Sequence, residues 1–207
     1  MSLITKLFHF VLYASSKYNI DESHGLSHSM NVLNFAHNIY VNELPDFSFL
    51  KEQERIIYTS AILHDMCDKK YMNENEGIYE IEEFLQEKLD PVEIEMTKNI
   101  ITTMSYSTVK KKGYPLLGSY QIAYHIVREA DLLSAYDFDR CMIYHMQKNK
   151  GSSIEESFEN ANELFEARVL KHIDDHMIGT KYGIRQSLLL HNHAKQRIRT
   201  WRKIIHK

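Results

Sequence analysis

Apolar residues recur at helical spacing through most of this sequence, and few helix-breaking residues interrupt them. Only 7 glycines and 3 prolines occur among the 207 residues. Long periodic stretches with so few breakers are typical of helices. The sequence therefore predicts a nearly all-α protein folded as a helical bundle. Its length fits one domain that can bury a full core without disulfides.

The expected helices can be placed from the apolar spacing and from helix-start signals. They are residues 3–18, 26–40, 49–67, 73–89, 91–104, 121–135, 136–147, 153–177 and 184–205. The clearest start is Asp90-Pro91-Val92-Glu93, where Asp90 suits the N-cap and Glu93 can complete a capping box. Residues 105–119 predict a long loop, which we expect to be a lid.

The remaining composition narrows the setting of the protein. Two cysteines, Cys67 and Cys141, form no disulfide framework, which predicts a reducing, cytoplasmic location. The net charge of -3 does not point to nucleic acid, and no apolar run is long enough to span a membrane. His9 interrupts the apolar N-terminal stretch, so we interpret that stretch as a packed helix and not as a signal peptide.

A histidine and an aspartate stand side by side at the end of the apolar stretch Ala61-Ile62-Leu63-His64-Asp65-Met66. Titratable groups at the inner end of an apolar helix are costly unless something satisfies them. An imidazole nitrogen beside a carboxylate oxygen suits a divalent metal ion. The alternative is a helix that ends there, with both side chains exposed.

Two further stretches place similar groups in apolar helical surroundings. His28 follows His24 near the start of the second expected helix, and Asp131 lies among Leu132, Leu133 and Ala135. Ligands from facing helices converge in the core of a bundle. We therefore expect His28, His64, Asp65 and Asp131 to bind one metal ion and to leave positions open for water and substrate.

The order His28, His64-Asp65, Asp131 resembles the signature of the HD domain superfamily of metal-dependent phosphohydrolases. The resemblance covers about residues 20–145 and includes His24, the Asp68-Lys69-Lys70-Tyr71 segment and Ser105. The order of these motifs is similar to that in one branch of the superfamily, whose small stand-alone members resemble bacterial nucleoside-triphosphate pyrophosphohydrolases. Asn31 departs from the arginine that the family usually has three residues after its first ligand. The resemblance implies a single HD domain over residues 1–207, with the C-terminal helices packed on it.

The resemblance also implies a reaction and a set of roles. One divalent ion (Mn, Mg, Fe, Co, Ni or Zn) would lower the pKa of a bound water from about 15.7 toward neutrality, which makes hydroxide available to attack phosphorus. Asp68 is the candidate to position or deprotonate the water, and Lys70 is the candidate phosphate contact. Further substrate contacts are predicted at His24, Lys69, Ser105 and Arg128. The expected substrate is a small-molecule phosphate ester, a nucleotide, in a pyrophosphohydrolase or phosphatase reaction.

Two alternatives stay open. The first is a catalytically silent HD-fold module that binds a nucleotide for regulation. The second is a phosphodiesterase acting on nucleic acid ends, because residues 179–207 carry eight Lys/Arg and no acid. We interpret His172 and His176, at i and i+4 spacing, as a surface pair and not as a second metal site. The sequence predicts no oligomeric state.

Overall fold

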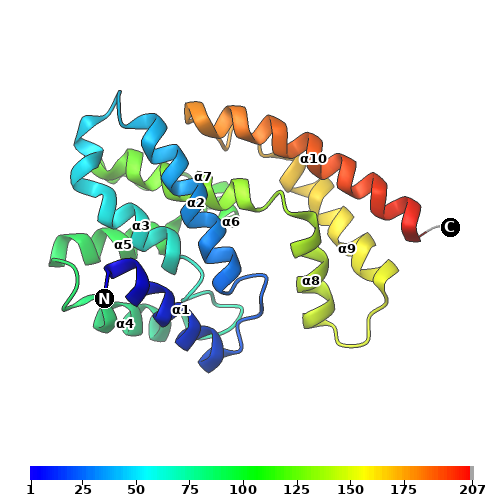
Figure 1. Cartoon of the computed structure of the whole chain (residues 1–207), viewed down its shortest axis with the longest axis horizontal. Coiled ribbons are helices and arrows are strands. Elements are labelled where there is room, and N and C mark those ends of the chain that lie inside the picture. Colours follow the sequence, from blue (N-terminus) through cyan, green and yellow to red (C-terminus); the bar gives the residue numbers. More distant parts are fainter. Residues whose placement is uncertain (206–207) are drawn as a thin grey trace.

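The structure, a computed structural model, describes residues 1–205. Within that range the chain forms ten α-helices and three short 3-10 helices and contains no strand, so the all-α prediction is confirmed. Figure 1 shows α1 to α7 gathered in one group, with α8 and α9 beside it. The last helix, α10, extends from the first group along the second.

The helices have the following bounds. The first group contains α1 (Leu3–Tyr18), α2 (Leu26–Glu43), α3 (Glu54–Leu63), α4 (Glu74–Leu85), α5 (Pro91–Thr103), α6 (Tyr106–Lys112) and α7 (Gln121–Ser134). The second contains α8 (Phe138–Lys148), α9 (Ile154–Ala167) and α10 (Lys181–Ile205). The 3-10 helices are η1 (Ser48–Gln53), η2 (Gly118–Tyr120) and η3 (Val169–Lys171).

Side-chain caps define the starts of several helices, as the sequence predicts. Asp90 and Glu93 form a complete capping box at α5, with Pro91 in the first turn. Ser153 and Glu156 form a second capping box at α9. Such a cap stabilises a helix by about 1 kcal/mol, because it satisfies backbone N–H groups that have no partner within the helix.

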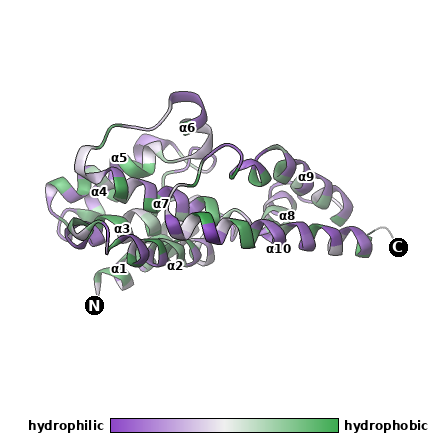
Figure 2. Cartoon of the chain, turned by 90° about the horizontal axis from the view of Figure 1, so that it is seen from above, coloured by the Kyte–Doolittle hydropathy of each residue, from purple (hydrophilic) through white to green (hydrophobic). Residues whose placement is uncertain are grey.

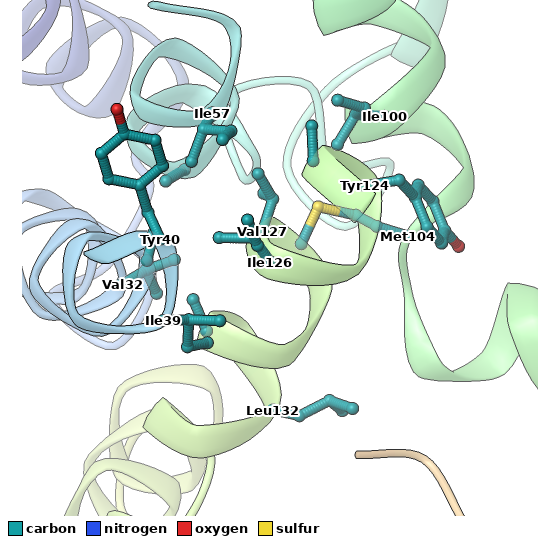
Figure 3. Packing of buried hydrophobic residues seen from close by; sticks show 14 of the residues in the cluster. Val32, Ile39, Tyr40, Ile57, Ile100, Met104, Tyr124, Ile126, Val127 and Leu132 are labelled. Atoms are coloured by element: carbon teal, nitrogen blue, oxygen red, sulfur yellow. The ribbon is translucent and has the colours of Figure 1, made fainter. Parts of the chain in front are cut away.

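The largest apolar cluster is built around α7. Figure 3 shows side chains of α2, α3 and α5, among them Val32, Ile57 and Ile100, directed toward Tyr124 and Val127 of α7. All five are fully buried. Packing on several sides fixes the position of α7, and with it the carboxylate of Asp131 near its C-terminal end.

A second apolar cluster lies under the chain that follows α3. Leu63, Met66 and Cys67 are buried there together with Leu7 of α1 and Ile81 of α4. The residues on both sides of His64-Asp65 are therefore anchored in the core. This anchoring explains how a turn outside regular helix can hold two polar side chains in fixed positions.

The C-terminal helices have a core of their own. The ring of Phe138 packs against those of Phe158 and Phe165, with centroids 5.6 and 5.1 Å apart. Ala194 and Ile198 of α10 are buried in the same cluster. In the view from above, α10 again runs from the first group of helices to the C-terminal one (Figure 2).

A buried carboxylate ties the start of α10 to α7. Glu129 accepts hydrogen bonds from the backbone N–H groups of Gly179 and Thr180, at 2.9 and 3.0 Å, and from the Thr180 hydroxyl at 2.6 Å. Gly183 packs so closely that a Cβ there would lie 2.7 Å from Glu129 Oε2. The first turn of α10 is therefore fixed on the first group of helices.

Four expected elements differ from the observed ones. The expected helix 49–67 is η1 followed by α3, which ends at Leu63, and the expected helix 73–89 ends at Leu85. The expected loop 105–119 contains α6, capped by Ser105. The expected helix 153–177 ends at Ala167, because the chain turns to bury His172, Met177 and Ile178. None of the described helices has both the length and the apolar character that crossing a membrane requires.

Candidate metal centre

Four side chains from three parts of the chain converge on one point. His28 lies in the first turn of α2, His64 and Asp65 follow the end of α3, and Asp131 lies in the last turn of α7. The Nε2 atoms of His28 and His64 are 3.0 Å apart, and Asp65 Oδ2 lies 3.2 Å from each. Asp131 Oδ1 lies 3.5 Å from His28 Nε2 and 3.7 Å from His64 Nε2. The predicted convergence of these four residues is thus observed.

Burial and charge strongly perturb this group. Burial opposes charge on His64, but the neighbouring carboxylates of Asp65 and Asp131 outweigh it and raise the pKa of His64 to about 9. Burial likewise opposes charge on Asp65, yet the nearby imidazoles of His64 and His28 outweigh it and hold the pKa of Asp65 well below its usual range. The pKa of Asp131 is lowered in the same way. The group therefore favours two anionic carboxylates next to positive charge.

The donor set fits a divalent metal ion. Asp65 Oδ2 is buried without a hydrogen-bond partner, which is costly for a carboxylate oxygen. The Nδ1–H of His64 can donate to the carbonyl of Ala61 at 2.9 Å, which directs Nε2 toward the carboxylates, where a metal ion would take the place of its proton. A metal-binding histidine commonly has its second nitrogen held in this way. Two nitrogens and two oxygens suit several divalent ions.

A cavity of about 300 Å³ opens beside the four side chains. Of the other residues predicted for the site, His24, Asp68, Lys70 and Ser105 line it. Lys69, which is exposed, does not line it.

Arg128 is the second predicted contact that the structure places away from this cavity. Its side chain is buried, donates to the carbonyl of Met177 at 2.5 Å and lies over the ring of Tyr114. It lines a different cavity, of about 340 Å³, between α7 and the start of α10. The contacts with Met177 and Tyr114 therefore hold the Arg128 guanidinium away from the cavity beside His28 and Asp131.

Asp68 and Lys70 form a pair at the cavity edge. Lys70 Nζ lies 3.0 Å from Asp68 Oδ2, and the backbone N–H of Lys70 donates to Asp68 Oδ1 at 2.9 Å. Burial opposes charge on Lys70, but Asp68 and Asp65 outweigh it and raise the pKa of Lys70. The amine therefore stays protonated next to the four converging side chains. Its Nζ also lies 3.4 Å from His24 Nε2.

His24 is held by a hydrogen-bonded group that the sequence analysis did not identify. The Ser23 and Tyr71 hydroxyls lie 2.7 and 2.9 Å from His24 Nδ1. Tyr71 donates to Asp21 Oδ2 at 2.6 Å, and Ser23 donates to Asp21 Oδ1. Asp21 thus orients the two hydroxyls that fix the His24 ring, leaving Nε2 toward Lys70. The position of Tyr71 directly after the Asp68–Lys70 segment is the one feature of the sequence that could have indicated its place at the site.

The C-terminal helices supply cavity residues that were also missed. Arg140 and Tyr144 come from α8, and Arg168 follows the end of α9. The ring centroid of Tyr144 lies 5.3 Å from that of His24. Each of these residues sits within an ordinary amphipathic pattern, so nothing local in the sequence marks it.

His172 and His176 do not lie on one helical face. His172 is fully buried between the rings of Tyr106 and Tyr136, and His176 has a left-handed backbone with φ of 53°. Both ring nitrogens of His172 lack a hydrogen-bond partner, and burial lowers its pKa to about 4. His172 is thus a neutral core residue, and the pair does not form a surface pair.

The basic last helix is packed against the rest of the protein. Several of its cations are engaged, since Arg197 pairs with Asp139, Lys181 lies 2.6 Å from Asp46, and Arg185 donates to Asn42 Oδ1 at 3.0 Å. Lys195, Arg199 and Lys203 are exposed, and Lys207 lies outside the described residues.

Comparisons of the chain with protein-family models, with curated proteins and with solved structures found no match.

Proposed function

We propose that this protein is a divalent-metal-dependent phosphohydrolase of the HD type that acts on nucleotides. The observation that carries the proposal is the convergence of His28, His64, Asp65 and Asp131 on one point. The order of these residues along the chain and their mixed nitrogen and oxygen donors support a metal ion there. The lysine and aspartate beside them support phosphoryl chemistry.

The four converging side chains would hold the ion. When bound, a divalent ion lowers the pKa of water to supply a nucleophile and polarises a phosphoryl oxygen. The chain must then position the phosphoryl group and neutralise its charge, which are the main demands of phosphoryl transfer. Asp68 accepts a proton from the attacking water or orients it, and the Lys70 ammonium binds a phosphoryl oxygen. Their ion pair places both groups at one edge of the cavity.

The cavity favours a small substrate over a polymer. Its volume of about 300 Å³ lies at the lower end of the range for small-molecule sites. The ring of Tyr144 on one wall gives an apolar face beside the charged groups. A nucleotide combines a planar base with phosphoryl groups and fits both features. Hydrolysis would release phosphate or pyrophosphate.

Metal analysis followed by a substrate panel tests the proposal. The purified protein should contain or bind one divalent ion per chain, and a panel of nucleoside mono-, di- and triphosphates should show turnover with manganese, cobalt or magnesium. Bound metal without turnover of any nucleotide would favour a regulatory binding module instead. Absence of both metal binding and turnover would refute the proposal.

A further inference from the structure

Two arginines of the C-terminal helices line the cavity without a carboxylate partner. Arg140 and Arg168 are half-buried, and neither forms an ion pair within residues 1–205. Other arginines of the chain are paired, such as Arg197 with Asp139 and Arg55 with Glu93. The two arginines at the cavity therefore differ from these in having no carboxylate at ion-pair distance among the described residues.

An unpaired cation at the wall of a cavity needs an anion from outside the chain. A guanidinium stays charged in proteins, so it cannot avoid the cost of partial burial by losing a proton. Its planar set of N–H donors matches the oxygens of a phosphate group in a bidentate arrangement. Two such groups around one small cavity are typical of phosphate recognition.

Arg140 contacts the candidate metal centre directly. Its Nη1 lies 2.9 Å from His28 Nε2, the same nitrogen that faces His64 and Asp65, and it also contacts His28 Nδ1. An atom this close to both ring nitrogens lies against the face of the imidazole, so the Nε2 atom stays available to a metal ion. The guanidinium lines the cavity beside it, where its N–H groups can bind an anion with or without the ion.

Arg168 is held by its face, which leaves its edges available. Its Cζ lies 4.5 Å from the centroid of the Tyr106 ring. The Tyr106 hydroxyl donates to Asp175 Oδ2 at 3.0 Å, and Lys110 contacts the same oxygen at 3.0 Å. The Asp175 carboxylate, which Tyr106 contacts, is thus already paired with Lys110. Stacking fixes the guanidinium plane while its N–H groups keep no protein acceptor.

We propose that Arg140 and Arg168 form an anion subsite that binds phosphoryl oxygens beyond the phosphoryl group held at the metal centre and Lys70. This inference rests on the proposed function and makes it more specific. Lys70 and the metal centre bind one phosphoryl group, and the two arginines bind a second. The subsite therefore selects ligands with at least two linked phosphoryl groups over those with one.

Calorimetric titration of the metal-free full-length protein with inorganic pyrophosphate tests this inference. The variants are Arg140→Gln and Arg168→Gln, and the charge-matched control is Arg199→Gln on the exposed face of α10. Because a hydrogen bond to a charged group is worth about 10- to 100-fold in affinity, each variant should weaken pyrophosphate binding by that factor. Binding of inorganic phosphate should be weaker than that of pyrophosphate in the unsubstituted protein. The control should bind both anions as the unsubstituted protein does.

A second readout concerns the metal. Arg140→Gln should strengthen binding of Mn²⁺, because it removes a positive charge that contacts His28, whereas Arg168→Gln should leave it unchanged. Circular dichroism and the melting temperature establish that each variant is folded. Should a glutamine variant not fold, the lysine variant at the same position keeps the charge but loses the bidentate fork, and it should bind pyrophosphate less tightly than arginine.

Three results would overturn the subsite. They are equal pyrophosphate affinity in the unsubstituted protein and both variants, an equal loss in the Arg199→Gln control, and no pyrophosphate binding by the unsubstituted protein. Failure of the proposed function gives a different pattern. In that case no nucleotide is turned over, while pyrophosphate binding still depends on Arg140 and Arg168, and the subsite stands without the reaction.

Discussion

His28 Nε2 and His64 Nε2 lie 3.0 Å apart, although the two residues are separated by 36 positions in the sequence. The helices that carry or precede them, α2 and α3, are packed together through Val32, Ala36 and Ile57 in one buried cluster. Their relative position is therefore set by the core and not by a ligand. Sites held by a packed scaffold in this way are well organised before anything binds.

Removing one of the converging side chains should abolish metal binding without unfolding the protein. For His64→Ala and Asp65→Ala we expect a loss of affinity for Mn²⁺ of more than about 100-fold, since even changes behind the ligands of a metal cost 10- to 100-fold. The helical content should persist, because the surrounding apolar residues are unchanged. Circular dichroism measures the helical content, and titration with Mn²⁺ measures the metal affinity. His37→Ala, at an exposed histidine, is the control and should bind metal normally.

Asp68 and Lys70 should matter for turnover and not for metal binding. Asp68→Asn removes the group expected to position or deprotonate water, which contributes about 10²- to 10⁴-fold to a rate. Lys70→Met removes the expected phosphate contact and should raise KM as well as lower kcat. The neighbouring Lys69→Met serves as the control because its side chain is exposed. A variant of Asp68 with full activity would exclude this role.

The buried imidazole of His172 should make the protein sensitive to acid. Burial, with Arg168 nearby, lowers the pKa of His172 from 6.5 to about 4. The unfolded chain therefore binds a proton near pH 6.5 that the folded protein cannot accept until about pH 4. Stability falls as the pH decreases through that range, by up to about 3 kcal/mol, and His172 contributes no loss above it.

The variant His172→Phe isolates this effect. A phenyl ring keeps the contacts with Tyr106 and Tyr136 but has no titratable nitrogen. In urea unfolding at pH 7 and pH 5, the variant should lose less stability on acidification than the unsubstituted protein. His193→Gln, at an exposed position of α10, should not change the pH dependence. Equal acid sensitivity in His172→Phe would contradict the prediction.

Around the start of α10, a methyl group should be tolerated at Gly179 and not at Gly183. A Cβ at Gly183 would lie 2.6 Å from Thr180 Oγ1 and 2.7 Å from Glu129 Oε2, within the hydrogen bonds that hold the turn. Gly183→Ala should therefore destabilise the protein by about 1–3 kcal/mol. A Cβ at Gly179 would be 3.7 Å from Glu129 Oε1, an ordinary contact. Gly179→Ala should leave the melting temperature nearly unchanged.

The elements that could be predicted from the sequence are those that local chemistry determines. The Asp90–Glu93 capping box and the apolar spacing around Asp131 depend on residues close in the chain, and both are observed. The convergence of His28, His64, Asp65 and Asp131 could be predicted because facing helices in a bundle direct polar side chains toward one core. The ion and the reaction stay predictions.

The features that could not be predicted depend on contacts between distant segments. The helix expected over 153–177 ends at Ala167 because Arg168 stacks on Tyr106 and His172 is buried beside it. The seven-residue helix α6 buries only Val109 of its own residues and is held to Asp175 through Tyr106. Arg140 reaches the site from α8, which faces the start of α2 across a cavity of about 410 Å³. No pattern within residues 153–177, α6 or α8 indicates these distant partners.

The last helix has a consequence for how the site is held together. α10 has 25 residues, about 37 Å of helix, and contributes no side chain to the cavity at the metal centre. Its first turn is fixed on α7 through Glu129, and Ile198 is buried with α8 and α9. It therefore bridges the helices that carry the histidines and those that carry the two arginines, and its packing on both holds the two walls of the cavity at their present separation.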